Sequence, residues 1–328
     1  MEVPSKTSKE VSLRQSLYNK LLFSLAFAAL IYLGFLLWSG WQDFVNELED
    51  FPLLCFLPVL LLSCGNYITR YIKFDIYLKT LGYHIPRLKG LAIFLAGLAG
   101  TVTPGKLGEV LKSLILERDC NAPISKTAPI VIAERLTDLA ALILITLVGL
   151  REFNGSKTPI MLGGAMLIAV LMIISWKSLC DGILDKLEAK EGVIGKLGSK
   201  LRKAYLSTET MLSPIDKLLI PIIISLLSWF FECLGFSLVL WAFGVEISLA
   251  KASFIYCFAT LDGALAMLPG GLGATEAIMI ALLSQGGVDK ATAAASTLII
   301  RACTLWFAVL VGALSLASLS RSSERSGF

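Results

Sequence analysis

Ten charged side chains lie inside or beside apolar stretches of this 328-residue sequence, where an isolated charge is costly. At the centre of a membrane helix a charged residue costs about 2.5 to 3.5 kcal/mol on insertion scales, so these side chains must line an interior site or pair with one another. The ten are Lys106, Glu109, Lys112, Glu134, Arg135 and Asp138 in one half of the chain, and Glu232, Asp262, Glu276 and Arg301 in the other.

Two interpretations of the arginines stay open. Arg135 and Arg301 bind a phosphate group, or each forms a buried ion pair with a carboxylate. Glu134 and Asp138 are at positions i and i+4 and share one helix face, with Arg135 next to the first, so a structural ion-pair cluster is the alternative to a ligand site.

Catalytic, metal-binding and nucleic-acid-binding chemistry has little support in the sequence. His84 is the only histidine, and histidine is the usual general base and a common metal ligand. The seven cysteines are scattered without a CxxC pair, which is typical of small apolar residues in helices. With 56% apolar and 16% charged residues, the composition excludes a disordered chain and a nucleic-acid partner. We therefore predict no enzyme activity, no cofactor and no metal.

The apolar stretches that position these charges are long enough to cross a bilayer, which takes about 20 residues. Six stretches qualify, at 21–40, 52–72, 127–150, 159–176, 215–243 and 292–319. Two more, at 88–118 and 250–285, are interrupted by proline and glycine, which free backbone groups that lipid cannot satisfy. We predict an all-α integral membrane protein with six spanning helices and two re-entrant hairpins of broken helices. The interrupting residues are Pro104, Gly105 and Gly108, then Pro269, Gly270, Gly271 and Gly273.

Lysine and arginine are distributed unevenly about these helices, which sets the orientation. With a cytoplasmic N-terminus, the inner segments hold 21 basic residues and the outer loops hold four. We therefore predict that the tails 1–20 and 320–328 are cytoplasmic and that residues 21–319 form one domain in the cytoplasmic membrane. The linker 177–214 keeps apolar residues at helical spacing, which indicates either an amphipathic helix at the membrane surface or a solvated linker.

An internal repeat relates the two halves of the chain at a nearly constant offset. The first set of matches pairs Gly82, Ile85 and Lys89 with Gly244, Ile247 and Lys251. The second pairs Pro104, Gly105, Leu107 and Gly108 with Pro269, Gly270, Leu272 and Gly273. In the third, Arg135 corresponds to Arg301. Repeat one covers about 52–150 and repeat two about 215–319. Because three spans separate the hairpins, the second enters from the opposite face, so the repeats are inverted, as in many secondary transporters. A duplication kept only for packing is the alternative.

The combined pattern resembles the flippase-like transmembrane domain of the lysylphosphatidylglycerol synthases, a family that includes uncharacterised integral membrane proteins. The resemblance covers roughly residues 15–320. It rests on Thr103–Val110, Glu134–Leu139, Pro269–Gly273, Glu276 and Arg301, and Arg70 and Glu232 also match family positions. It implies two inverted re-entrant hairpins and a role in moving lipids between leaflets.

Lysyl transfer to phosphatidylglycerol is not implied, because we recognise no aminoacyltransferase domain in the sequence. Lys106 and Lys112 stand where arginine is common, which weakens the case for bidentate phosphate recognition there.

The function that we expect is a lipid transporter that moves an anionic phospholipid or a polyprenyl-phosphate-linked lipid between leaflets. Lys106, Arg135 and Arg301 hold the headgroup, together with the prolines and glycines of the two breaks. The carboxylates pair with these cations in the empty site and couple charge to transport; they are Glu109, Glu134, Asp138, Glu232, Asp262 and Glu276. The expected partners are membrane lipids and a lipid-modifying synthase or glycosyltransferase. The alternatives are a membrane subunit or enzyme of lipid-linked glycan or aminoacyl-lipid synthesis, and a structural protein that anchors a synthase.

Overall fold

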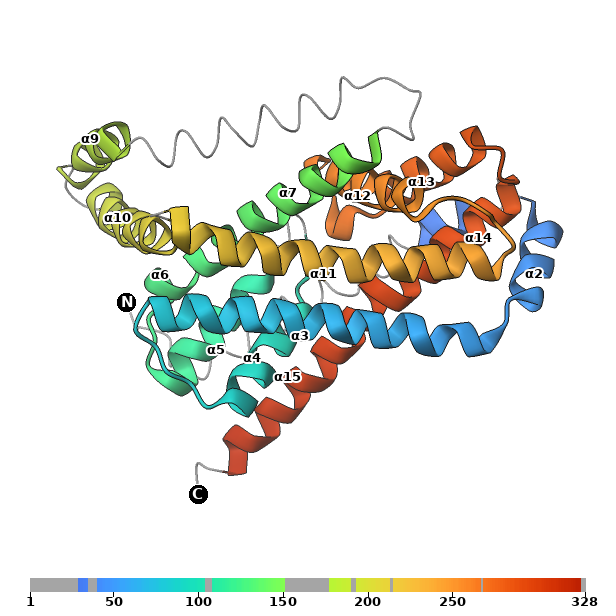
Figure 1. Cartoon of the computed structure of the whole chain (residues 1–328). Coiled ribbons are helices and arrows are strands. Elements are labelled where there is room, and N and C mark those ends of the chain that lie inside the picture. Colours follow the sequence, from blue (N-terminus) through green and yellow to red (C-terminus); the bar gives the residue numbers. More distant parts are fainter. Residues whose placement is uncertain are drawn as a thin grey trace.

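Helices make up all the regular structure in the part of the chain that the computed structural model describes (Figure 1). The described residues are 29–34, 40–103, 108–150, 177–189, 193–212, 215–266 and 268–325. Parts of the sequence-based predictions lie outside these ranges: the tail 1–20, the span 159–176, most of the span 21–40, the last residues of the tail 320–328, and Pro104, Gly105 and Lys106.

The helices follow one another in an order that occurs twice: a long helix, a hairpin of two short helices, and a further long helix. The first half contains α2 (Trp41–Asp50), η1 (Leu53–Cys55), α3 (Phe56–Thr80), α4 (Arg87–Leu98), α5 (Leu111–Cys120), α6 (Ile124–Thr127) and α7 (Pro129–Gly149). The second half contains α9 (Lys177–Glu188), α10 (Val193–Leu212), α11 (Ile215–Ala242), α12 (Leu249–Leu265), η4 (Pro269–Gly271), α13 (Ala274–Gln285), α14 (Lys290–Arg301), η5 (Ala302–Trp306) and α15 (Phe307–Arg325).

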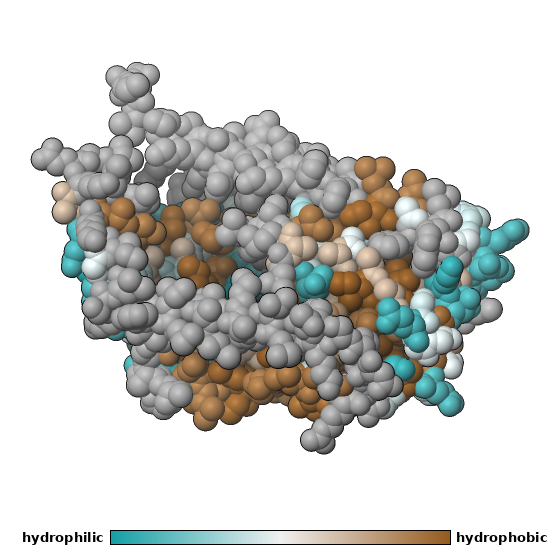
Figure 2. All heavy atoms as spheres, turned by 90° about the horizontal axis from the view of Figure 1, so that it is seen from above, coloured by the Kyte–Doolittle hydropathy of each residue, from teal (hydrophilic) through white to brown (hydrophobic). Residues whose placement is uncertain are grey.

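Three continuous helical segments in the described part of the chain are long and apolar enough to cross a membrane: Leu53–Thr80, Lys217–Ala242 and Lys290–Arg321. They overlap the predicted spans 52–72, 215–243 and 292–319. Large apolar side chains such as Leu57, Ile223 and Leu314 are exposed along them, and Figure 2 shows apolar side chains gathered in broad areas of one face. The chain is therefore an all-α integral membrane protein. The helix α7 (Pro129–Gly149) lies within the predicted span 127–150 but is not among these three segments.

One predicted boundary is wrong. The predicted second span ends at residue 72, whereas α3 continues to Thr80, and Arg70 and Lys73 are both buried. A hydropathy window ends at a lysine because it treats the charge as solvated. Here Lys73 lies beside Asp138 of α7, so the helix stays inside the protein.

The ends of α3 and α11 follow from one local motif. Each helix is followed by a glycine with positive φ, Gly82 at 84° and Gly244 at 70°, which residues with a Cβ adopt only at a cost. The N–H groups of Tyr83 and Val245 then donate to carbonyl oxygens of the last helical turn, each at 2.9 Å. Both turns lead directly into the first short helix of a hairpin, α4 or α12.

The two hairpins are interrupted where the sequence predicts. Between α12 and α13, Gly270, Gly271 and Gly273 have φ values of 61°, 69° and 87°, the conformation expected of glycines at a break. In the first hairpin, the Gly108 N–H donates to Thr103 Oγ1 at 2.6 Å and joins the two sides of the break.

Packing exchanges the hairpins between the two halves. The helices α3 and α11 pack side by side and run in opposite directions (Figure 1). The last helix of each half then packs on the hairpin of the other half: α7 contacts α12, and α15 contacts α4. Glycines allow both close approaches, since a Cβ on Gly149 would lie 2.7 Å from the Ala250 carbonyl oxygen and a Cβ on Gly312 would overlap the Ala99 backbone.

We expect Gly149→Ala and Gly312→Ala each to lower the free energy of unfolding by about 1 to 3 kcal/mol, because the added methyl overpacks the crossing. Thermal unfolding in detergent measures this. Gly182→Ala in α9 is the control, because nothing lies within 4 Å of its Cβ position and alanine favours a helix. Equal behaviour of all three variants would contradict close packing at the crossings.

Candidate functional site

A cavity of about 300 Å³ lies where the two hairpins approach α3, α7, α11 and α14. Its polar and aromatic lining includes Tyr67, Arg70, Thr101, Arg135, Asp138, Trp229, Glu232, Tyr256, Thr260, Thr275, Arg301 and Thr304, and Gly270 and Gly271 add backbone. The breaks of the hairpins meet beside it, because a Cβ on Gly270 would lie 3.5 Å from Val102 Cα. The fold therefore brings charged residues from both halves of the chain to one internal space.

The two repeat-related arginines make similar ion pairs. Arg135 Nη2 donates to Glu109 Oε2 at 3.1 Å, and Arg301 Nε donates to Glu276 Oε1 at 2.6 Å. In each half, the glutamate lies at the start of the short helix after the break, and the arginine lies in the next long helical segment. Both arginines therefore have carboxylate partners, which is the ion-pair interpretation of these residues. Both also line the cavity.

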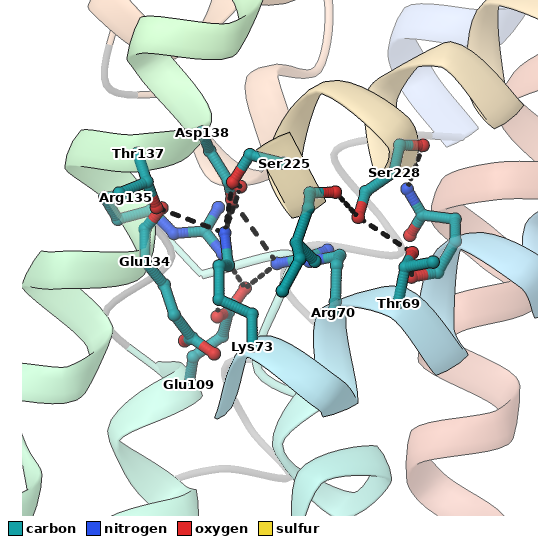
Figure 3. Close-up of polar contacts among 12 residues, drawn as sticks. Thr69, Arg70, Lys73, Glu109, Glu134, Arg135, Thr137, Asp138, Ser225 and Ser228 are labelled. Carbon is teal, nitrogen blue, oxygen red and sulfur yellow. Dashed lines mark hydrogen bonds and ion pairs between the residues drawn. The ribbon is translucent and has the colours of Figure 1, made fainter. Parts of the chain in front are cut away.

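Asp138 is held beside the cavity by a lysine with no exposed surface. Lys73 Nζ donates to Asp138 Oδ1 at 2.6 Å, to Ser225 Oγ at 2.7 Å and to Thr137 Oγ1 at 3.2 Å. These contacts use all three protons of the ammonium group and connect α3, α7 and α11 (Figure 3). A buried ammonium group with three acceptors, one of which is a carboxylate, is well compensated for its lost hydration.

Glu134 has a lysine partner of the same kind. Lys112 Nζ donates to Glu134 Oε2 at 2.6 Å and lies 3.7 Å from Glu109 Oε2. It also lies 5.1 Å from the ring centroid of Phe74 and 5.2 Å from that of Phe94, which are cation–π distances. This lysine is thus part of the buried ion network rather than of the cavity lining.

Some polar atoms at the cavity have no hydrogen-bond partner among the described residues. They are Arg70 Nη2, Arg135 Nε, Thr101 Oγ1 and Asp138 Oδ2. Arg70 is only 8% exposed, and its Nη2 atom is 3.8 Å from Glu109 and 3.9 Å from Asp138, too far for hydrogen bonds. Buried donors are normally paired, so the unpaired donors of residues that line the cavity call for a partner, such as an acceptor atom of a ligand.

The charged side chains at the second half of the cavity have hydrogen-bond partners of a different kind. Arg301 Nη2 donates to the Gly270 carbonyl at 2.7 Å, and the Gly273 N–H donates to Glu276 Oε2 at 2.7 Å, so this ion pair also holds the break. Glu232 Oε2 accepts a 2.6 Å hydrogen bond from the Tyr256 hydroxyl. Arg301 is followed at once by a π-helical turn, a distortion that is frequent at functional sites.

The structure brings most of the predicted site residues together. Arg135, Asp138, Glu232, Gly270, Gly271 and Arg301 line the cavity. Glu109, Glu134 and Glu276 pair with cations beside it. Gly108, Asp262, Pro269 and Gly273 do not line it, and Pro104, Gly105 and Lys106 lie outside the described residues. Among the described residues, no group of three His, Cys, Asp or Glu side chains could hold a metal ion.

Sequence reasoning missed Lys73 and left Arg70 and Lys112 out of the predicted site. Arg70 and Lys73 are at positions i and i+3, on one face of a helix, and a helix that continues past them would have placed both inside. A further signal was available in the internal repeat, because the offset that relates Gly82 to Gly244 also aligns Arg70 with Glu232.

Comparison with known proteins gives a family match over most of the chain. The family described as the lysylphosphatidylglycerol synthase TM region matches residues 21–312. A UPF0104 membrane protein of Methanothermobacter thermautotrophicus is 25% identical over 315 residues, which covers 90% of this chain and 92% of the relative. Another, from Pyrococcus horikoshii, is 20% identical over 303 residues, which covers 84% of this chain and 90% of the relative.

We expect Lys73→Met to lower the free energy of unfolding by about 3 to 5 kcal/mol, because it leaves Asp138 with a broken buried pair. Adding Asp138→Asn should restore much of this loss. Lys79→Met is a matched control on the same helix, because Lys79 also lies 2.6 Å from a carboxylate, on Asp75, but is 52% exposed. Its expected cost is within about 0.5 kcal/mol. Equal losses at both lysines, measured by thermal unfolding, would contradict the burial argument.

Proposed function

The chain belongs to the family of the lysylphosphatidylglycerol synthase TM region, and from this we propose that it is a lipid translocase. It moves an anionic phospholipid or a polyprenyl-phosphate-linked lipid between the leaflets of the membrane. The headgroup passes through the cavity, while the acyl or isoprenoid chains stay in the bilayer. The chain acts as a transporter and not as an enzyme, and a lipid-modifying synthase or glycosyltransferase supplies or uses the lipid.

The observation that carries the proposal is the pair of arginine side chains with unpaired donors in a cavity inside a membrane protein. Arg70 and Arg135 both line the cavity, and each has a buried nitrogen without a hydrogen-bond partner among the described residues. An unpaired donor in a region of low dielectric is unfavourable, and a phosphate oxygen removes that cost. The exposed apolar surfaces of the helices keep the lipid chains in contact with the protein.

The proposal includes six spans arranged as two inverted repeats with re-entrant hairpins. It is supported by the opposite directions of α3 and α11 (Figure 1), the matching glycine turns at Gly82 and Gly244, and the exchange of hairpins between the halves. A pair of inverted units can present a central site to each side of the membrane in turn. The excess of lysine and arginine in the inner segments supports cytoplasmic termini and a place in the cytoplasmic membrane.

Translocation is tested directly by reconstituting the purified protein in liposomes with a fluorescent anionic phospholipid and measuring the rate at which label leaves the outer leaflet. We expect the protein to accelerate this movement and Arg135→Gln to slow it by about tenfold, because a charge-assisted contact with the headgroup is lost. Arg118→Gln is the control, because Arg118 pairs with Asp119 away from the cavity. A protein that is folded but leaves the lipid in place would contradict the proposed function.

Inverted topology is tested by two single cysteines at repeat-related positions on a cysteine-free background. His84→Cys and Glu246→Cys are equivalent positions of the two repeats, and both lie at exposed positions in the turns after α3 and α11. We expect a membrane-impermeant thiol reagent added outside intact cells to label the cysteine at 246, and to label the one at 84 only after the cells are opened. Labelling of both from the same side would contradict inversion.

A further inference from the structure

We infer that the cavity contains a phosphodiester-binding site formed by Arg70, Arg135 and Thr101, and that Arg301 is a positioning residue that holds the second hairpin. This inference rests on the proposed function and narrows its substrate to lipids whose headgroup phosphate carries a single negative charge. It also divides the roles of two arginines that the internal repeat makes equivalent.

The first half of the cavity has the free donors. Arg70 Nη2, Arg135 Nε and Thr101 Oγ1 are all buried, all belong to residues that line the cavity, and have no hydrogen-bond partner among the described residues. Two guanidinium groups and a hydroxyl match the several acceptor oxygens of a phosphate.

The two guanidinium groups are close enough to share one ligand. Arg70 Nη2 is 3.9 Å and Arg135 Nη2 is 3.5 Å from the same atom, Asp138 Oδ2. Both also lie beside Glu109, at 3.8 and 3.1 Å. The carboxylates therefore gather the two cations at one wall but leave Arg70 without short hydrogen bonds, and a phosphate can complete its pairing.

Arg301 differs because its donors already hold the protein together. Its Nε atom donates to Glu276 Oε1 at 2.6 Å and its Nη2 atom donates to the Gly270 carbonyl at 2.7 Å. The other oxygen of Glu276 accepts from the Gly273 N–H at 2.7 Å. These three bonds fix both sides of the glycine-rich break, so removing Arg301 changes the stability of the hairpin before it changes any contact with a ligand.

Glu232 of α11 limits the charge that the site accepts. Its carboxylate lines the same cavity and occupies the repeat position that corresponds to Arg70. A phosphodiester carries one negative charge, whereas a phosphomonoester carries up to two near neutral pH. A second negative charge in the cavity is repelled by this carboxylate in a region of low dielectric. The site therefore favours a phosphodiester headgroup.

The test is a lipid titration of the purified full-length protein in neutral detergent, with the bound fraction measured by native mass spectrometry. The probes are short-chain phosphatidylglycerol, short-chain phosphatidic acid and inorganic phosphate. We expect phosphatidylglycerol to bind more tightly than phosphatidic acid by about fivefold or more, and Glu232→Gln to remove this preference, because a nearby charge is worth about that much. Competition by inorganic phosphate as strong as that by the lipid would overturn the assignment to a lipid headgroup.

Variants of Arg70 and Arg301 distinguish a loss of lipid binding from a loss of protein stability. We expect Arg70→Gln to weaken phosphatidylglycerol binding by about tenfold or more. Arg70→Lys keeps the charge but loses the planar fork, so it should fold and still bind weakly. Arg301→Gln should lower the unfolding temperature, with binding by the folded fraction within about threefold of the original. Unchanged binding in a folded Arg70 variant overturns the inference, and so does a stable Arg301→Gln variant that loses binding as Arg70→Gln does.

The same preparations distinguish this inference from the translocase proposal. If Arg70 controls phosphatidylglycerol binding but the reconstituted protein moves no lipid, the site stands and the translocase proposal fails. If lipid moves at the same rate in the folded Arg70→Gln and Arg70→Lys variants and their binding is unchanged, translocation stands and the assigned site fails.

Discussion

A carboxylate buried among membrane helices has no water to hydrate it, so a cation of the protein has to compensate its charge. Glu109, Glu134 and Asp138 meet this requirement with Arg135, Lys112 and Lys73, which lie 3.1, 2.6 and 2.6 Å away. The pairs connect the first hairpin with α3 and α7, and a further hydrogen bond from Lys73 reaches Ser225 of α11. The internal packing of the charged half of the protein depends on these contacts, because breaking any one of them removes the shortest ion pair of a buried carboxylate.

This network stops short of satisfying every polar group of the residues that line the cavity. The carboxylates draw two arginines to one wall, but the distances of 3.8 and 3.9 Å to Arg70 leave a guanidinium nitrogen unpaired. The second hairpin meets the first through glycine backbone at Gly270, where a Cβ would lie 3.3 Å from Leu305 and 3.5 Å from Val102, so the missing side chain allows the two breaks to approach closely. A mainly apolar cavity with a few charged and polar groups on its walls is the place that we propose for a lipid headgroup, since the lipid chains need not enter it.

The two halves of the chain are more alike in backbone conformation than in their buried charged residues. The same glycine turn follows α3 and α11, and Asn66 Nδ2 donates at 2.8 Å to the carbonyl of Ser228, its equivalent in the second repeat. The buried charges are not repeated in this way: Arg70 aligns with Glu232, and Lys73 aligns with Gly235. The cavity is therefore lined asymmetrically, with Arg70, Arg135 and Asp138 from the first half of the chain and Glu232 and Arg301 from the second.

The sequence by itself determined the membrane class, three of the apolar spans and the positions of the breaks, because hydrophobic length and proline–glycine patterns act locally along the chain. It also identified Arg135, Asp138, Glu232 and Arg301 as residues of an internal site, since charge in an apolar stretch is costly wherever it lies. Only the tertiary structure decided which charge pairs with which, because Lys73 and Asp138 are far apart in the chain and meet through helix packing. For the same reason the predicted span ends just before Lys73, whereas the partner of Lys73 on α7 keeps this lysine buried.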